Sequence, residues 1–375
     1  MPHPDQDGLG EHDLRFIMSL RATGEGHISS IEFRAGIIRA DGSIQMEMAT
    51  PFATLPDLNP NPTFHKFTFL EKLNEMGLEN DWSAGLMAQL KRRFSFDELE
   101  ISVEQAVANK TPAGSVAIER DIRRTMECIH WLAESNYEIS FDSSSAVSER
   151  IIFPVSSNES NGIEDARFVR FVDDDGSVTY YATYTAYNGR VILPQLIETA
   201  DFLHFRILTL NGRAAQNKGM ALFPRRVDGR YAMLSRQDDE NLFLMYSDNP
   251  HFWSDPRPLQ GPLHPWEFVK IGNCGSPIET EAGWLVLTHG VGPMRKYCIG
   301  AILLDRHDPS RVIGRLDKPL LKPEGSEREG YVPNVVYSCG ALVHAGRLIL
   351  PYGLSDSVST IVTMEVRDIL AAIQG

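Results

Sequence analysis

The sequence predicts an all-β protein, a five-bladed β-propeller with a helical insertion between its first and second blades. Two observations support this fold class. A strand–turn–strand unit recurs four times along the chain, and a stretch with helical spacing of apolar residues separates these units from an earlier strand pair. Units of roughly 40–50 residues with about four strands each are typical of propeller blades. We therefore expect a ligand to bind at the central channel.

Each recurring unit has a tight turn that ends in glycine and leads into a strand rich in β-branched and aromatic residues. The turn glycines are Gly176, Gly229, Gly283 and Gly346. The strands that follow them are Tyr180–Tyr187, Tyr231–Arg236, Trp284–His289 and Leu348–Tyr352. Residues 14–50 supply one more strand pair, which turns at Asp41 and Gly42. This pair brings the expected number of blades to five.

Residues 64–145 have a different composition. The segments 67–80, 82–94 and 115–135 look helical, and Ser95 with Glu98 predicts a capping box before a further helix. We expect residues 1–63 to form an N-terminally shortened first blade, 64–145 the helical insertion, and 146–375 the remaining blades of a single domain. The insertion is expected either to pack and mediate contacts between copies or to cover the functional site.

Composition restricts the class of partner. The formal charge of −14 argues against a duplex nucleic-acid partner, although a local cluster of Arg and Lys can still bind a small anion. The four cysteines form no CxxC pair, and the polar N-terminus has no signal-peptide pattern. No apolar run is long enough for a membrane span. We expect a cytoplasmic protein that binds neither nucleic acid nor membranes.

The first candidate site is the loop of Glu164, Asp165 and Arg167. Adjacent carboxylates repel each other when both are ionised, which favours retention of one proton near neutral pH, as a general acid requires. The alternative is a salt bridge in a surface loop.

The second candidate site is a set of cationic residues that lie further along the sequence than the Asp165 loop. Arg236 and Lys270 occupy equivalent points of successive units, so both can reach the axis, and such a pair suits an anion such as phosphate. His289 ends a strand and can bind a hydroxyl or an oxyanion. The alternatives are separate surface charges and a structural histidine. The sequence has no nucleotide-binding glycine loop, GxSxG elbow or HExxH zinc motif, and no metal site is expected.

Several motifs taken together resemble those of glycoside hydrolase family 130, the β-mannoside phosphorylases and β-mannosidases. The resemblance covers residues 161–187, 218–236 and 266–356. The motifs that carry it are Gly162-Ile-Glu-Asp165, Leu222-Phe-Pro224, Met233-Leu-Ser-Arg236, Lys270-Ile-Gly272, Leu287-Thr-His-Gly290 and Tyr331-Val-Pro-Asn-Val-Val336. The helical segment lies outside the usual family core.

The resemblance implies a five-bladed propeller that cleaves β-mannosidic bonds with inversion. Asp165 matches the family's general acid, whose proton is thought to travel through a sugar hydroxyl. Inorganic phosphate, the only expected co-substrate, would give mannose 1-phosphate with no further cofactor. The expected phosphate-binding residues are Arg236, Lys270, Lys218, His289 and Tyr297. The expected substrate-binding residues are Asn161, Glu164, Tyr187, Glu267 and Asp356.

Two positions depart from the family pattern. Ala166 stands where proline is common, and Arg225 stands where glutamate is common. Arg225 adds positive charge that favours an anionic co-substrate, unless it faces solvent. Two other functions stay open, an inverting β-mannosidase with Glu267 as the carboxylate that activates water and a non-catalytic sugar-binding propeller.

Overall fold

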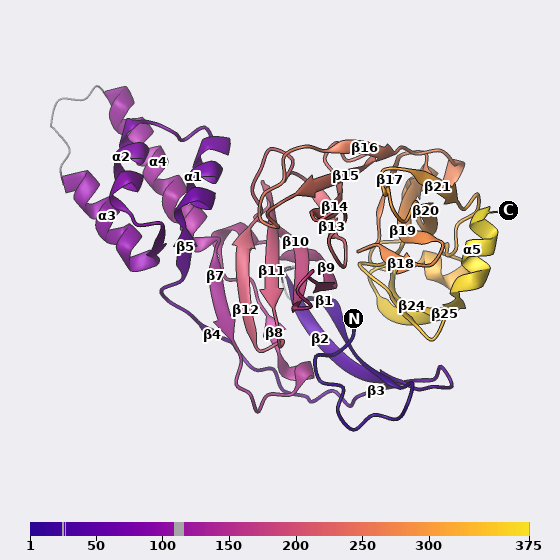
Figure 1. Cartoon of the computed structure of the whole chain (residues 1–375). Helices are drawn as coiled ribbons and strands as arrows, with labels where there is room; N and C mark the ends of the chain where they lie inside the picture. The colour runs from indigo at the N-terminus through magenta and orange to yellow at the C-terminus, as the bar shows by residue number, and fades with distance from the viewer. Residues whose placement is uncertain (25, 27, 109–115, 375) are drawn as a thin grey trace.

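The computed structural model describes residues 1–24, 26, 28–108 and 116–374. The protein is mostly β (Figure 1). Five antiparallel sheets of four to six strands occupy one part of the molecule, and a group of helices projects from the second sheet. A C-terminal helix, α5 (Val366–Gln374), covers the opposite side of the sheets.

Each sheet is built mainly from consecutive strands. The first sheet contains β1 (Leu14–Thr23), β2 (Ser29–Ile38), β3 (Ile44–Met46) and β8 (Ile151–Ile152). The second contains, in spatial order, β4 (Asp57–Leu58), β7 (Tyr137–Ser140), β12 (His204–Thr209), β11 (Ile192–Thr199), β10 (Val178–Tyr187) and β9 (Ile163–Val172). The third contains β13 (Lys218–Leu222), β14 (Tyr231–Arg236), β15 (Leu242–Ser247) and β16 (Arg257–Gln260).

The last two sheets follow the same pattern. The fourth contains β17 (Lys270–Asn273), β18 (Ile278–Thr280), β19 (Gly283–Gly292), β20 (Lys296–Leu304) and β21 (Val312–Arg315). The fifth contains β22 (Val336–Tyr337), β23 (Leu342–His344), β24 (Arg347–Leu354) and β25 (Val358–Glu365). Short 3-10 turns connect some strands, namely η2 (Val147–Glu149), η3 (Ser157–Glu159), η4 (Pro265–Glu267), η5 (Pro293–Arg295) and η6 (Gly325–Arg328).

The four predicted glycine turns are confirmed as hairpins. They join β9 to β10, β13 to β14, β18 to β19 and β23 to β24. The four glycines have φ values between 71° and 141°, a region that other residues rarely adopt. The turn at Asp41 and Gly42 joins β2 to the short β3, and a longer hairpin pairs β2 with β1.

The predicted helices are present, but the expected segments 67–80 and 82–94 were too long, because the helices there end at Glu75 and Gln89 and Arg93–Ser95 form a strand. The helices are α1 (Lys66–Glu75), α2 (Asp81–Gln89), α3 (Phe96–Ala108) and α4 (Val116–Glu134), while residue 115 lies outside the described residues. The capping box is confirmed: the Glu98 amide donates to Ser95 Oγ at 3.2 Å, and the Ser95 amide donates to Glu98 Oε2 at 3.0 Å. Within the described ranges, none of the helices has the length and apolar character that crossing a membrane requires.

The helical group has its own core but shares a sheet with its flanking strands. Buried apolar side chains from the helices and from the hairpin of β5 (Thr63–His65) and β6 (Arg93–Ser95) pack together. Strand β4, before the helices, and β7, after them, pair with each other in the second sheet. The expected segments 1–63 and 64–145 therefore each contribute a strand to that sheet. Strand β7 has only four residues, too few for its alternating burial to stand out in the sequence.

Apolar clusters join each sheet to the next along the chain. Phe33 of the first sheet contacts Phe205 of the second, and Phe171 of the second stacks on Tyr231 of the third. A third cluster joins the third and fourth sheets, and a fourth joins the fourth and fifth sheets to helix α5. A smaller cluster of Phe16, Ile38 and Ile349 joins the first sheet to the fifth. Each of these five sheets thus contacts two others through buried apolar side chains.

Candidate active site

A β-bulge positions Asp165. Glu164 pairs with Thr185 and Arg167 pairs with Thr183, so Asp165 and Ala166 together lie opposite a single residue of β10. Asp165 has a φ of 55°, the left-handed region that Asp adopts more readily than most residues. Bulges of this kind interrupt a ladder and redirect a side chain, and they are frequent near active sites.

The carboxylate of Asp165 is fixed by two partners. The Tyr337 hydroxyl donates to Asp165 Oδ2 at 3.3 Å. The buried Arg167 guanidinium donates to the Tyr337 hydroxyl at 2.6 Å and to the Asp165 carbonyl at 2.9 Å, and its Nη2 lies 3.7 Å from Asp165 Oδ2. The Asp165 side chain is 22% exposed, so a ligand can still reach it.

The prediction that Asp165 retains a proton because Glu164 is adjacent is wrong. Burial acts to raise the pKa of Asp165, but Arg167, Lys218, Arg21 and His289 outweigh it and hold the pKa below its usual value. Glu164 is itself paired with cations, and its carboxylate contacts Lys218 and, at 3.2 Å, Arg21. In the free protein Asp165 is therefore ionised at neutral pH.

The expected substrate-binding residues Asn161 and Tyr187 lie beside Lys218. The Lys218 ammonium is 6.0 Å from the centre of the Tyr187 ring. The backbone N–H of Asn161 donates to the Tyr187 carbonyl at 2.9 Å, and Asn161 is exposed. Lys218 is ion-paired with Glu164 and so holds the loop of Asp165 in place, but Arg21 shares the same carboxylate, so one counter-ion serves two cations here as well.

Arg236 and Lys270 share one counter-ion. Arg236 Nη2 lies 3.1 Å from Asp239 Oδ1, and Lys270 Nζ lies 2.5 Å from Asp239 Oδ2. Arg236 is paired in register with Lys218 across β13 and β14. Its Nε is buried and has no hydrogen-bond partner within the described chain. The predicted cation pair therefore exists, with more positive charge than Asp239 neutralises.

His289 is the buried neighbour of this pair. Arg236 Nη1 donates to His289 Nε2 at 3.0 Å, and since a guanidinium has no acceptor, the ring proton lies on Nδ1 and is donated to the Asn273 carbonyl at 3.1 Å. Burial, followed by Arg236 and Arg167, lowers the pKa of His289 to about 3. The ring is therefore neutral at physiological pH. A Cβ at Gly272 would lie 2.5 Å from the ring, so this position requires glycine.

Two tyrosines connect His289 to the acid. The Tyr297 ring stacks on His289 with centroids 6.1 Å apart, and the Tyr337 ring lies edge-on to His289 at 5.0 Å. Through Tyr337, the contacts run without interruption from Asp165 to His289 and on to Arg236. The acid and the cations are therefore connected through adjacent side chains, although Arg236, Lys270 and His289 do not line the cavity that opens beside Asp165.

A cavity of about 730 Å³ opens beside Asp165, between β1, β9 and the fifth sheet. Arg21, Tyr337 and Asp356 line it together with Asp165, and the rest of its wall is largely apolar. Asp356 is exposed on the turn between β24 and β25. The expected substrate residue Asp356 therefore lies across this cavity from the second sheet.

Glu267 and Arg225 have other partners. Glu267 is buried, and its Oε2 accepts the amides of Leu263 at 3.0 Å and His264 at 3.1 Å, which caps the turn η4. Arg225 forms a two-pronged ion pair with Glu279 at 2.7 and 2.8 Å. Neither of these two side chains contacts Asp165 or Asp239. The charge of Arg225 is neutralised by Glu279.

Sequence reasoning missed three residues of this site: Tyr337, Asp239 and Arg21. Tyr337 directly follows the motif at 331–336, and that position was its only signal. Asp239 follows Arg236 by three residues in an acidic turn, where it looked like an ordinary surface residue. Arg21 comes from β1, and no local pattern links it to Glu164.

Comparisons with known proteins agree on a family. A family model described as beta-1,4-mannooligosaccharide phosphorylase matches residues 129–374. The 1,2-beta-oligomannan phosphorylase of Thermoanaerobacter sp. (strain X514) is 36% identical over 228 residues, which are 59% of this chain and 75% of that protein. The beta-1,2-mannobiose phosphorylase of Listeria innocua serovar 6a is 32% identical over 227 residues, which are 58% of this chain and 62% of that protein.

The fold is similar to that of a solved structure. The beta-1,2-mannobiose phosphorylase from Listeria innocua, solved with beta-1,2-mannobiose, aligns with a TM-score of 0.57 and 22% sequence identity. The alignment covers 100% of this chain and 96% of that chain. At this identity the likeness concerns the fold.

Proposed function

Because this chain belongs to glycoside hydrolase family 130, we propose that it catalyses the inverting phosphorolysis of β-mannosides. The products would be mannose 1-phosphate and a shortened sugar. One observation carries the proposal: the carboxylate of Asp165 is joined through Tyr337 and His289 to the cation pair of Arg236 and Lys270. An acid and an anion site held together are what phosphorolysis requires.

In the proposed reaction a phosphate oxygen attacks C1 of the mannosyl residue on the face opposite the leaving oxygen. The bond from C1 to that oxygen breaks, and the oxygen takes a proton that Asp165 supplies through a sugar hydroxyl. Arg236, Lys270 and the Tyr297 hydroxyl would hold the phosphate, with neutral His289 orienting Arg236. Fixed cations of this kind stabilise charge that develops in the transition state. No metal or organic cofactor takes part in this scheme.

The lowered pKa of Asp165 suits an ordered reaction. Four cationic or polar neighbours hold this carboxylate ionised in the free protein. Bound phosphate would offset part of their positive field, and the pKa of Asp165 would then rise toward the range that a proton donor needs. We therefore propose that phosphate binding prepares Asp165 to carry the proton.

We also propose that the five sheets are the five blades of a propeller. The support is that apolar clusters join each sheet to the next and that Phe16, Ile38 and Ile349 join the first to the last. At the same seam His344 Nε2 contacts the His12 carbonyl at 2.7 Å. Asp165 and the cation pair would lie where the blades meet.

Hydrolysis is the second candidate. It would need a carboxylate base to activate water, and Glu267 was the expected one. The engagement of Glu267 with two backbone amides favours phosphorolysis over hydrolysis. A cytoplasmic location and contact between copies through the helical group both stay predictions.

The test is incubation with β-1,2- and β-1,4-linked manno-oligosaccharides, with and without phosphate, followed by assay of mannose 1-phosphate and free mannose. Asp165→Asn is the control, because it keeps the shape of the side chain and removes the acid. We expect mannose 1-phosphate only with phosphate present, and a rate at least 100-fold lower in the variant. Free mannose without phosphate would instead establish a hydrolase. Sugar binding with no turnover would establish a binding protein.

A further inference from the structure

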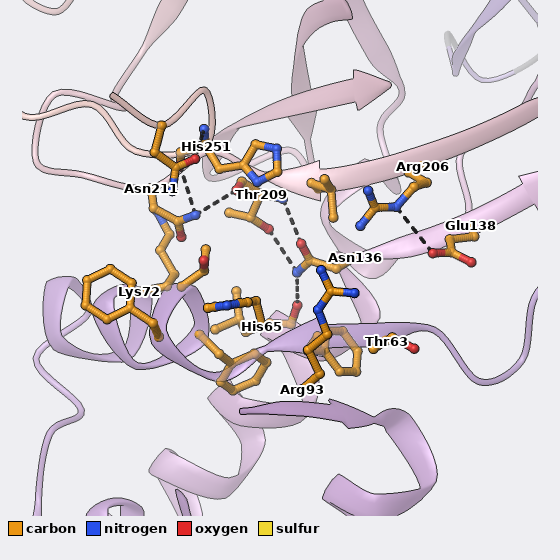
Figure 2. Close-up of a pocket in the computed structure, with 17 residues that line it drawn as sticks. Thr63, His65, Lys72, Arg93, Asn136, Glu138, Arg206, Thr209, Asn211 and His251 are labelled. Atoms are coloured by element: carbon orange, nitrogen blue, oxygen red, sulfur yellow. Dashed lines mark hydrogen bonds and ion pairs between the residues drawn. The ribbon is translucent and has the colours of Figure 1, made fainter. Parts of the chain in front are cut away.

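A second cavity lies between the helical group and the second sheet (Figure 2). Its volume is about 490 Å³, within the range of small-molecule sites. Helix α1 and the hairpin of β5 and β6 form one wall, and β7 and β12 form the other. Asp165, Arg236 and Lys270 do not line it. This cavity is thus separate from the candidate active site.

The cavity contains a cation without a counter-ion. Arg93 lines it and has no carboxylate within 4.0 Å among the described residues. Lys72, by contrast, is buried and donates to the Leu210 carbonyl at 3.0 Å and to Glu75 at 3.2 Å. Arg206 is paired with Glu138 at 3.4 Å. Arg93 therefore gives one part of the wall an unneutralised positive charge.

A histidine beside Arg93 lacks a hydrogen-bond partner. His65 is paired in register with Arg93 across β5 and β6, and its Nδ1 is shielded from solvent with no partner in the described chain. Burial, followed by Arg92, Arg93 and His251, holds the pKa of His65 below its ordinary value. A buried polar atom without a partner is costly unless a bound molecule supplies one.

The remaining wall suits a hydroxylated ring. Phe67 is 59% exposed at the cavity and offers an apolar face. Thr63 and Asn249 supply neutral polar groups, and Glu138 can accept hydroxyl hydrogen bonds. In Figure 2 Lys72 lies at one end of the cavity and Glu138 at the other, with His65 and Arg93 between them. Because Lys72 is paired with Glu75 and Glu138 with Arg206, the unpaired charge of the cavity is that of Arg93, between them.

We propose that this cavity binds a phosphorylated monosaccharide. Its phosphate would contact Arg93, His65 and the free proton of Lys72, and its hydroxyls would face Glu138. The bound molecule would connect the helical group to the second sheet, so binding would stabilise the contact between them by mass action. The site is inferred from its own residues and does not rest on the reaction proposed above.

The test measures binding to the full chain by titration calorimetry, with mannose 1-phosphate, mannose and inorganic phosphate as probes. The decisive variant is Arg93→Gln. Its matched control is Arg92→Gln, which removes the neighbouring exposed arginine that does not line the cavity. We expect two molecules of mannose 1-phosphate per chain in the wild type and in the control. In Arg93→Gln we expect affinity at one of the two sites to fall at least tenfold.

A third variant separates this site from the candidate active site. Arg236→Gln weakens the proposed catalytic phosphate site. This variant should therefore still bind mannose 1-phosphate in the second cavity, the site at which Arg93→Gln loses affinity. If the wild type does not catalyse the proposed phosphorolysis, it should bind a single molecule of mannose 1-phosphate. Arg93→Gln should still lose that binding. Equal binding by Arg93→Gln and Arg92→Gln would overturn the second site. So would unphosphorylated mannose binding there as tightly as mannose 1-phosphate.

Discussion

The hydroxyl of Tyr337 lies 3.3 Å from Oδ2 of Asp165 and at the same time accepts a 2.6 Å hydrogen bond from Arg167. Because the phenol accepts from a guanidinium, its own proton is directed at the carboxylate. The same ring lies edge-on to His289. Tyr337 therefore fixes the proposed acid relative to the side of the site where phosphate would bind.

Tyr337→Phe should lower kcat/KM about tenfold or more. The change removes a hydrogen bond to a charged group, which contributes about 1.5–3 kcal/mol, and leaves one donor of Arg167 without its partner. Since the lost bond stabilises the ionised carboxylate, its removal should raise the pKa of Asp165, and the alkaline limb of the pH–rate profile, where the proton donor loses its proton, should move to higher pH. Steady-state kinetics from pH 4 to 9 measure both effects. An unchanged profile would mean that the tyrosine only fills space.

Lys270→Gln should raise the KM for phosphate at least tenfold and leave the KM for the mannoside within about threefold. Among the described residues, Lys270 and Arg236 share Asp239 as their one counter-ion, so loss of one cation leaves the other largely neutralised. The control is Lys318→Gln, which removes an exposed lysine outside the site. Initial rates at varied phosphate and fixed mannoside measure the effect. A parallel rise in both KM values would point to a general loss of structure.

Arg225→Ala should not change the KM for phosphate. Its guanidinium pairs with Glu279 and lies 4.8 Å from the centre of the Trp284 ring. Because the side chain is 41% exposed, the pair and the ring contact together stabilise the fold by about 1 kcal/mol. Denaturant unfolding should show that small loss, with unchanged phosphate kinetics. A higher KM for phosphate would show that Arg225 contributes to binding of the anionic co-substrate.

His289 should make the protein less stable as pH falls from about 6.5. Its folded-state pKa of about 3 is below the unfolded value of 6.5, so in this window the unfolded chain binds a proton that the folded chain does not. Unfolding is therefore favoured as pH falls, by about 2 kcal/mol between pH 6.5 and 5. Between pH 6.5 and 5 the unfolding free energy of His289→Asn should therefore fall by about 2 kcal/mol less than that of the wild type. Urea titrations at both pH values test this, and equal slopes would show that His289 is not the group responsible.

Short sequence patterns were sufficient to predict those elements whose stabilising contacts lie between residues close in sequence. The glycine turns and the capping box of Ser95 and Glu98 depend on residues close in sequence, and each is present. The family resemblance grouped Arg236, Lys270 and His289 as phosphate-binding residues; Arg236 contacts His289 and shares Asp239 with Lys270, and their role stays a prediction. The placement of β4 and β7 in one sheet depends on pairing across the whole helical group, and no short-range signal records it.

The electrostatics of the site were harder to predict. The expected repulsion between Glu164 and Asp165 considered only sequence neighbours, whereas the field at Asp165 comes from Arg167, Lys218, Arg21 and His289. Arg21 lies on the first sheet, and Lys218 begins β13, four strands after β9 and on the third sheet. The sign of a pKa shift in a buried site depends on such long-range neighbours, which a single sequence does not reveal.

Glu267→Gln should leave turnover unchanged, with or without phosphate. Its Oε2 accepts the amides of Leu263 and His264, and the amide oxygen of glutamine can accept the same two bonds. We expect a loss of only about 1 kcal/mol in unfolding free energy and a kcat within twofold of the wild type. A residue acting as catalytic base would instead lower the rate at least 100-fold.

Glu159 provides a matched comparison, because it caps η3 in the way that Glu267 caps η4. Its Oε2 accepts the amides of Val155 and Ser156, but its Oε1 also accepts the hydroxyls of the buried Tyr137 and Tyr184. Glu159→Gln cannot keep all these bonds, so it should cost about 3 kcal/mol. Denaturant unfolding of both variants should show this difference, with Glu267→Gln fully active. A fully folded but inactive Glu267→Gln would reverse the assignment and favour hydrolysis.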